Sequence, residues 1–135
     1  MIGELAAIAA AVLLGGLVSF QLVLAAGAPL GEYAWGGAHR VLPRGLRIGS
    51  VVATFIYVLA ALTVLETAGL VDFVASADLP RNAVWLLAGL FGIGTIMNAI
   101  SRSRKERRMA LVALALSGLC VVVAVAGSEA VAGTS

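Results

Sequence analysis

The residues best suited to chemistry stand close together in one short stretch, GEYAWGGAHRVLP at positions 31–43. It carries a carboxylate, two large aromatic rings, an imidazole and a guanidinium, on Glu32, Tyr33, Trp35, His39 and Arg40. An imidazole titrates near neutral pH, and a carboxylate in a partly dry site can be shifted toward it, so Glu32 and His39 could form a general acid–base pair. No nucleophile motif accompanies them, and the catalytic residues stay unassigned.

A few polar side chains interrupt the apolar segments that we expect to form helices. They lie in the half of the bilayer next to the 31–43 stretch. Each is costly in lipid and needs a reason. They are Gln21, Ser50, Thr54 and Asn98. Because bundle interiors often hold binding sites, we expect a polar pocket open to the cytoplasm. Its expected ligand-binding residues are Gln21, Glu32, Tyr33, Trp35, His39, Arg40, Ser50, Thr54 and Asn98.

Simpler roles compete with this pocket. Gln21 and Asn98 could hydrogen-bond across helices, and Tyr33 and Trp35 could be interfacial belt aromatics. A purely structural turn, however, has no need of a carboxylate, two aromatic rings and an imidazole together. We expect Gly36 and Gly37 to take positive φ angles and reverse the chain. Glu32 would then meet Arg40 or His39, because a lone carboxylate near the hydrocarbon boundary is costly.

The elements that must position these residues are membrane helices. The chain has 135 residues, of which 61% are hydrophobic and 12% charged, and its mean hydropathy is +1.08, whereas a soluble domain is about half apolar and a quarter charged. Four segments are long enough to cross lipid as helices. They cover about 3–28, 47–71, 82–100 and 104–128. We predict a single all-α membrane domain over 1–135, an up-down-up-down bundle of four transmembrane helices with an irregular cytoplasmic loop between the first two.

Local signals set the helix starts. Ser103 and Glu106 fit a capping box at the start of the fourth helix. Asp78 and Pro80 fit the cap and first turn of the third helix. The first apolar segment lacks the positive region of a signal peptide, so we expect a retained helix.

Charge predicts the orientation. Eight of the nine basic residues fall in the 31–47 and 102–108 connections, and only Arg81 lies on the other side. Lys and Arg near helix ends mark the cytoplasmic side, so we expect both termini outside, in a multi-pass protein of the bacterial plasma (inner) membrane. The basic excess then reflects topology and contact with membrane lipids, and not nucleic acid. The expected lipid-headgroup and topology residues are Arg44, Arg47, Arg102, Arg104, Lys105, Arg107 and Arg108.

The spacing of small residues and the scarcity of cysteine and histidine bear on oligomers, disulfides and metal sites. Small residues recur every four positions in three rows, Ala11-Gly15-Ser19, Ala88-Gly92 and Ala113-Ser117. Such rows serve close helix packing, either inside the bundle or in a homo-oligomer. With one cysteine and one histidine in the chain, we expect no disulfide, no metal site and no cofactor.

The strings GAPLGEYAWGGAHRVLP, LRIGS and MNAISRSRKER resemble those of uncharacterised small four-helix bacterial integral membrane proteins. The resemblance implies the topology and gives weight to residues 27–43, but it implies no activity or substrate.

Three functions remain open. The first is a binding or accessory protein whose cytoplasmic-face pocket takes a small molecule, a lipid headgroup or a partner. The second is a membrane enzyme that uses Glu32 and His39 on a lipophilic substrate. The third is an oligomeric transporter or channel subunit, which would lack the usual charged residue at the bilayer centre. We favour the first.

Overall fold

Four long helices build the protein in the computed structural model, which describes residues 1–76 and 78–133. They are α1 (Ile2–Ala25), α2 (Arg44–Thr67), α3 (Asp78–Ala99) and α4 (Arg104–Ala132). Each is long and apolar enough to cross a membrane. The prediction of an all-α protein with four such helices is therefore confirmed, and the bounds differ from the expected ones by about one turn or less.

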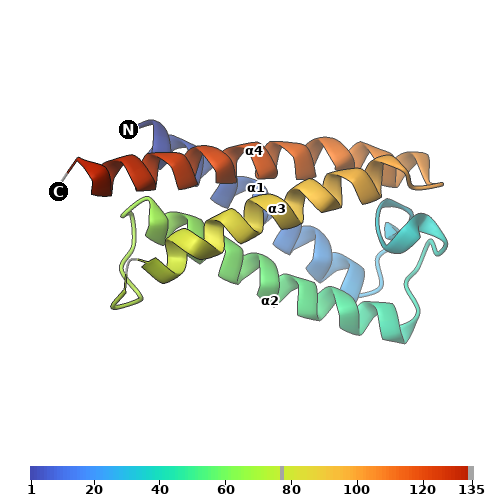
Figure 1. Cartoon of the computed structure of the whole chain (residues 1–135). Coiled ribbons are helices and arrows are strands. Elements are labelled where there is room, and N and C mark those ends of the chain that lie inside the picture. Colours follow the sequence, from blue (N-terminus) through green and yellow to red (C-terminus); the bar gives the residue numbers. More distant parts are fainter. Residues whose placement is uncertain (77, 134–135) are drawn as a thin grey trace.

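The helices place two groups of connections at opposite ends of the molecule (Figure 1). Both termini and the α2–α3 connection lie at one end. The 26–43 segment and the short α3–α4 turn lie at the other end. The most extensive packing is between α1 and α2 and between α3 and α4, whereas α2 and α3 touch more sparsely.

The tightly packed core lies in the half of the bundle nearer the termini. Its fully buried side chains come from the early part of α1, the late part of α2, the early part of α3 and the late part of α4. Examples are Ala7, Leu14, Val64, Val84 and Val123. Alanines among them let the helix backbones approach closely. The half nearer the 26–43 segment is packed less completely, and that half contains the candidate site.

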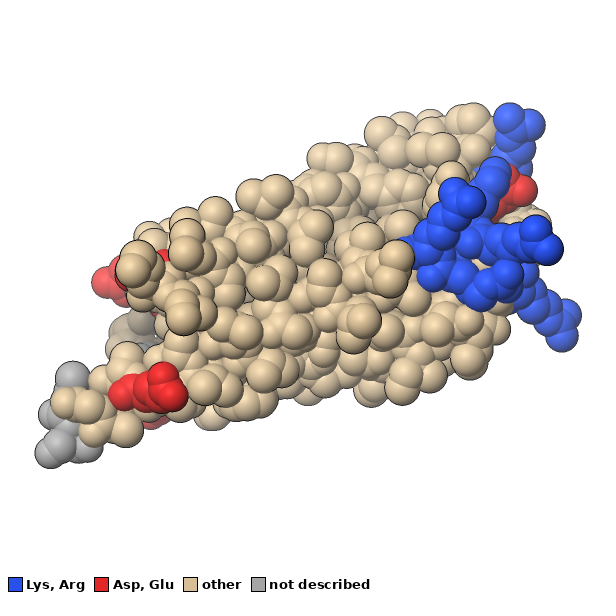
Figure 2. Space-filling view, turned by 90° about the horizontal axis from the view of Figure 1, so that it is seen from above, with Lys and Arg blue, Asp and Glu red and all other residues tan. Residues whose placement is uncertain are grey.

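Charged side chains gather at the two ends, with an uncharged band between them (Figure 2). All basic side chains except Arg81 form one dense group, because the 31–47 segment and the start of α4 lie at the same end. Acidic residues mark the start of α1 and α3 and the end of α2 and α4, at the opposite end. They include Glu4, Asp78, Glu66 and Glu129.

The structure can be compared with the expected first turn of α3 and with the expected roles of the small-residue rows. Pro80 lies in the first turn of α3, as expected, and Asp78 lies in the same turn, where its carboxylate is 3.3 Å from a guanidinium nitrogen of Arg81. Ser117 Oγ donates a hydrogen bond to the Ala88 carbonyl at 2.8 Å, so the rows on α3 and α4 serve internal packing. In α1, Gly15 lies exposed on the outer face.

Candidate ligand-binding site

The 26–43 segment folds back on itself at the basic end of the bundle. It contains two short 3-10 turns, η1 (Gly31–Tyr33) and η2 (Trp35–Gly37). Gly36 and Gly37 have φ angles of 81° and 70°, the positive values expected at this reversal. The Gly31 N–H donates to the Arg40 carbonyl at 2.8 Å and closes the loop.

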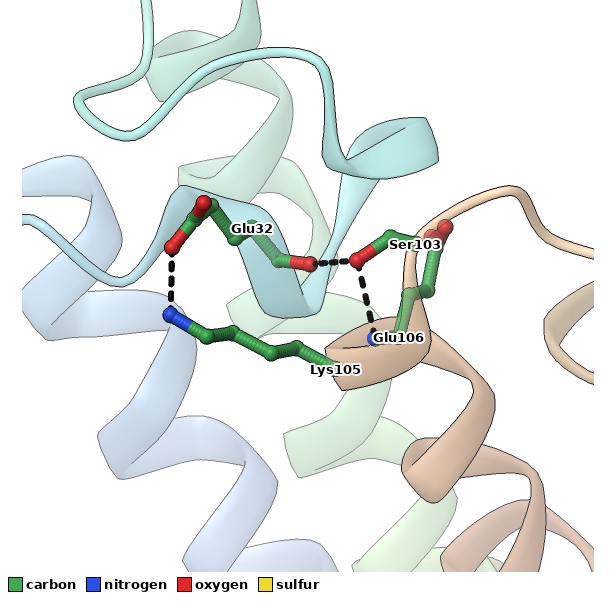
Figure 3. A network of polar contacts seen from close by, with 4 residues as sticks. All are labelled: Glu32, Ser103, Lys105 and Glu106. Atoms are coloured by element: carbon green, nitrogen blue, oxygen red, sulfur yellow. Dashed lines mark hydrogen bonds and ion pairs between the residues drawn. The ribbon is translucent and has the colours of Figure 1, made fainter.

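Ser103, at the start of α4, fastens this loop to the bundle (Figure 3). Its Oγ donates to the main-chain carbonyl of Glu32 at 2.6 Å and accepts from the Glu106 N–H at 3.2 Å. The second contact confirms Ser103 as the N-cap of α4. One hydroxyl thus satisfies a free helix amide and an otherwise unpaired loop carbonyl.

The Glu32 carboxylate pairs with Lys105 of α4, and not with Arg40 or His39 as expected. The reason is the fold of the segment: the glycine turn lays Glu32 against the first turn of α4, while His39 and Arg40 remain exposed. The hydrogen bond and positive charge of Lys105 lower the pKa of Glu32 below its ordinary value, and Arg40 adds only a weaker charge effect. The Lys105 ammonium also lies 5.6 Å from the centre of the Tyr33 ring, a cation–π distance.

Glu106 plays a different part from the one its capping-box position predicts. Its carboxylate accepts from the Gly36 N–H at 3.0 Å and from the Ser101 hydroxyl. It does not reach back to the Ser103 N–H, which instead donates to Ser101 Oγ at 3.1 Å. The loop amide and Ser101 already occupy the carboxylate, and the residue is only 8% exposed. Glu106 therefore holds the second half of the loop as Ser103 holds the first.

Trp35 is anchored into the bundle. Its indole N–H donates to Ser50 Oγ at 3.1 Å, and its ring lies so close to Gly49 that a Cβ there would be 2.8 Å from it. Trp35 also has a φ of 55°, which costs an L-residue about 1–2 kcal/mol. The indole contacts hold this backbone conformation, and Trp35 remains 42% exposed, so an interfacial-belt role is compatible with this anchoring.

Below this loop the four helices line a half-open cavity of about 370 Å³. Most of its wall is apolar, from residues such as Phe20, Ile56, Leu87, Phe91, Met109 and Leu116. Polar groups also line it, on Gln21, Tyr33, Trp35, Tyr57, Asn98 and Glu106. Since η1, η2 and the last turns of α1 and α3 supply most of these groups, the polar part of the wall lies at the loop end of the cavity.

Gln21 is a buried polar residue of this wall. It is 6% exposed, and its Oε1 has no hydrogen-bond partner in the described chain. A buried amide acceptor without a partner costs about 1–3 kcal/mol. Among residues 1–76 and 78–133, the Asn98 side chain likewise makes no hydrogen bond. The expected alternative of a hydrogen bond between helices is therefore not observed for either residue.

The structure brings together some of the expected pocket residues and separates others. Gln21, Tyr33, Trp35 and Asn98 line the cavity, and Ser50 lies behind Trp35. Thr54 does not line it, and its hydroxyl donates to the Ser50 carbonyl of its own helix at 3.0 Å. Glu32, His39 and Arg40 lie outside the wall.

Sequence reasoning missed Tyr57 and Glu106 as cavity residues. Both carried a signal, since Tyr57 shares a helix face with Ser50 and Thr54, and Glu106 is a carboxylate among bases at the lipid boundary.

Several basic residues assigned to lipid headgroups have partners inside the protein. Arg47 Nε donates to the Ala25 carbonyl at the end of α1, at 2.7 Å, where a cation complements the helix dipole. Arg107 donates to the Ser101 carbonyl at 2.8 Å, and Lys105 is paired with Glu32. The other headgroup candidates are exposed: Arg44, Arg102, Arg104 and Arg108.

The wall chemistry suits an uncharged amphipathic molecule. No lysine, arginine or histidine among the described residues lines the cavity, and its one carboxylate already accepts two hydrogen bonds. The Gln21 and Asn98 side chains line the cavity, and neither amide has a hydrogen-bond partner among the described residues. No protein-family model, curated protein or solved structure matches this chain.

Proposed function

We propose that this is a multi-pass membrane protein that binds a lipophilic small molecule in the cavity among its four helices. The observation that carries the proposal is the buried Gln21 amide, whose oxygen has no protein partner and whose side chain lines the cavity. Proteins rarely leave such a group unsatisfied. A ligand hydrogen-bonded to Gln21 would remove the cost.

The size and character of the cavity support this function. Small-molecule sites measure about 300–1,000 Å³ and combine apolar walls with a few placed polar groups. The observed 370 Å³ and its wall fit that description. The cavity is half open, and exposed residues of α2 and α3, Ile56 and Leu90, lie in its wall. A lipid-soluble molecule would enter from the bilayer between these two helices.

The orientation follows from charge. We infer that the chain crosses a bacterial plasma membrane up-down-up-down with both termini outside, since eight of the nine basic residues lie at the loop end. The polar end of the cavity then faces the cytoplasm. The exposed arginines of this end would contact anionic headgroups, each contributing about 1 kcal/mol.

Two other functions have less support. An acid–base enzyme using Glu32 and His39 would need both at the cavity, and neither lines it. A transporter or channel would need a polar path through an oligomer. The outward-facing row on α1 leaves room for a homo-oligomer, but the polar wall groups described above lie toward one end.

Two glycines of α3 give a matched test of the binding function. Gly94 lines the cavity and Gly89 does not, and a Cβ added at either would meet nothing within 4 Å. Both substitutions to leucine improve helix propensity by a similar amount, but only Gly94→Leu fills the cavity. Native mass spectrometry of protein released from a mild detergent should show a retained small molecule on wild type and Gly89→Leu, and lose it on Gly94→Leu. Equal retention by all three would contradict the proposal.

A further inference from the structure

The cavity wall also specifies the headgroup of its ligand. Building on the proposed function, we infer that the ligand carries a neutral headgroup that both donates and accepts hydrogen bonds, as a hydroxyl or a carboxamide does. Gln21 and Asn98 would hold this headgroup, with the apolar part of the ligand lying along Leu87, Phe91 and Leu116.

Gln21 sets the donor requirement. A side-chain amide has one carbonyl oxygen and one NH₂ group, so it is fully satisfied only by a partner that gives and takes a hydrogen bond. The oxygen of Gln21 is enclosed and has no partner. An aliphatic ether or a hydrocarbon could not satisfy it, because neither has a donor hydrogen.

Asn98 supplies a second amide from a different helix. It lies at the end of α3, as Gln21 lies toward the end of α1, and both line the same cavity. Tyr33, Trp35 and Tyr57 also line the cavity with neutral polar groups, and Glu106 is the one charged residue among the described residues of its wall. The polar wall is therefore made mainly of neutral groups, which match a neutral headgroup.

The charges around the cavity disfavour an anionic headgroup. No described basic side chain lines the wall, and the one lysine of the sequence, Lys105, is paired with Glu32 outside it. The buried Glu106 carboxylate adds a negative charge to the same wall. A carboxylate or phosphate ligand would lose its hydration, gain no cation and meet a like charge.

Four decyl probes test this headgroup preference: decanol, decyl methyl ether, decanoate and decylamine, compared at a mildly alkaline pH. They share one chain and differ in donor capacity and charge. The probe-bound fraction is measured by native mass spectrometry on wild type, Gln21→Leu and the control Asn82→Leu, which removes an exposed amide of α3 outside the cavity. Each probe partitions into the detergent equally for all three proteins, so differences between proteins report the site.

We expect wild type and Asn82→Leu to prefer decanol over the ether by about three- to tenfold, the factor of one neutral hydrogen bond. The preference should fall to near unity in Gln21→Leu, and decanoate should bind most weakly. An equal decanol-to-ether ratio in all three proteins would overturn the headgroup inference and leave the binding function standing. Stronger binding of decanoate or decylamine than of decanol would also overturn it. Failure of every probe to bind wild type would contradict the binding function itself.

Discussion

The hydroxyl of Ser103 lies 2.6 Å from the main-chain oxygen of Glu32, across 71 positions of sequence. The same hydroxyl caps α4 by accepting from the Glu106 N–H. The start of one transmembrane helix and the loop that closes the cavity therefore depend on one side chain. The neighbouring Lys105–Glu32 and Glu106–Gly36 contacts strengthen this junction from either side.

Replacing Ser103 should destabilise the protein clearly. Ser103→Ala removes the helix cap and the bond to the loop, and we expect a loss of about 2 kcal/mol in the free energy of unfolding. Ser128→Ala is the control, because the Ser128 hydroxyl bonds only to the Ala124 carbonyl of its own helix. Unfolding in a denaturing detergent titration measures both variants. Equal losses of stability in the two variants would contradict the claim that Ser103 joins the loop to α4.

The two glycines of the loop should differ sharply when replaced by alanine. Both have positive φ angles, so each substitution strains the backbone by about 1–2 kcal/mol. A Cβ on Gly36 meets nothing, whereas one on Gly37 would lie 2.3 Å from Ser103 Cβ. Gly37→Ala should therefore displace the loop and speed tryptic cleavage after Arg40 much more than Gly36→Ala. Similar cleavage rates would show that the loop does not pack on α4 as described.

The Glu32–Lys105 pair predicts a pH dependence. Lys105 lowers the pKa of Glu32 in the folded protein below its ordinary value of 4.5, so the pair stabilises the fold above that value. The stabilisation is lost as the pH falls through the lowered pKa. Glu32→Gln should lower the thermal midpoint at neutral pH, and its difference from wild type should close in acid. Glu4→Gln, at the opposite end, should show no such pattern, and a constant Glu32→Gln difference at every pH would refute the pairing.

The sequence alone predicted those structural features that depend only on residues close together in the chain. Hydropathy located the four helices, the glycine pair indicated a reversal, and the serine before α4 indicated its cap. Each is a property of a short stretch of chain. The approximate composition of the cavity wall was also accessible, because Gln21, Asn98 and Trp35 were costly residues in their surroundings.

Contacts between distant segments could not be predicted in the same way. The partner of Glu32 depends on where the loop packs relative to α4. Basic residues lie both in the 39–47 segment and in the 102–108 segment, so the sequence offered several partners in either place. Glu106 fits a local capping pattern, yet its carboxylate serves Gly36, 70 positions away. The cavity itself arises from incomplete packing between helices, which no stretch of sequence encodes by itself.

Gln21 should be dispensable for folding. Gln21→Leu removes a buried amide whose oxygen has no partner and adds apolar surface, so the ligand-free protein should be as stable as wild type or more stable, by up to about 1–3 kcal/mol. Phe91→Ala serves as a contrasting variant, because it removes apolar packing against the core and should destabilise. The thermal midpoint of delipidated protein in one detergent measures both. A marked loss of stability in Gln21→Leu would mean that its amide is structural and not reserved for a ligand.

The most direct test of the central claim is to trap the molecule in the cavity. A photoreactive benzoylphenylalanine at position 91 would line the cavity, whereas the same residue at Phe55, which is 66% exposed on α2, would face the lipid. After irradiation of cells, intact-mass measurement of the purified proteins shows what each position captured. We expect one defined small-molecule adduct at position 91, absent at position 55, and absent at 91 when Gly94→Leu is added. Only phospholipid adducts at both positions, unchanged by Gly94→Leu, would contradict the central claim.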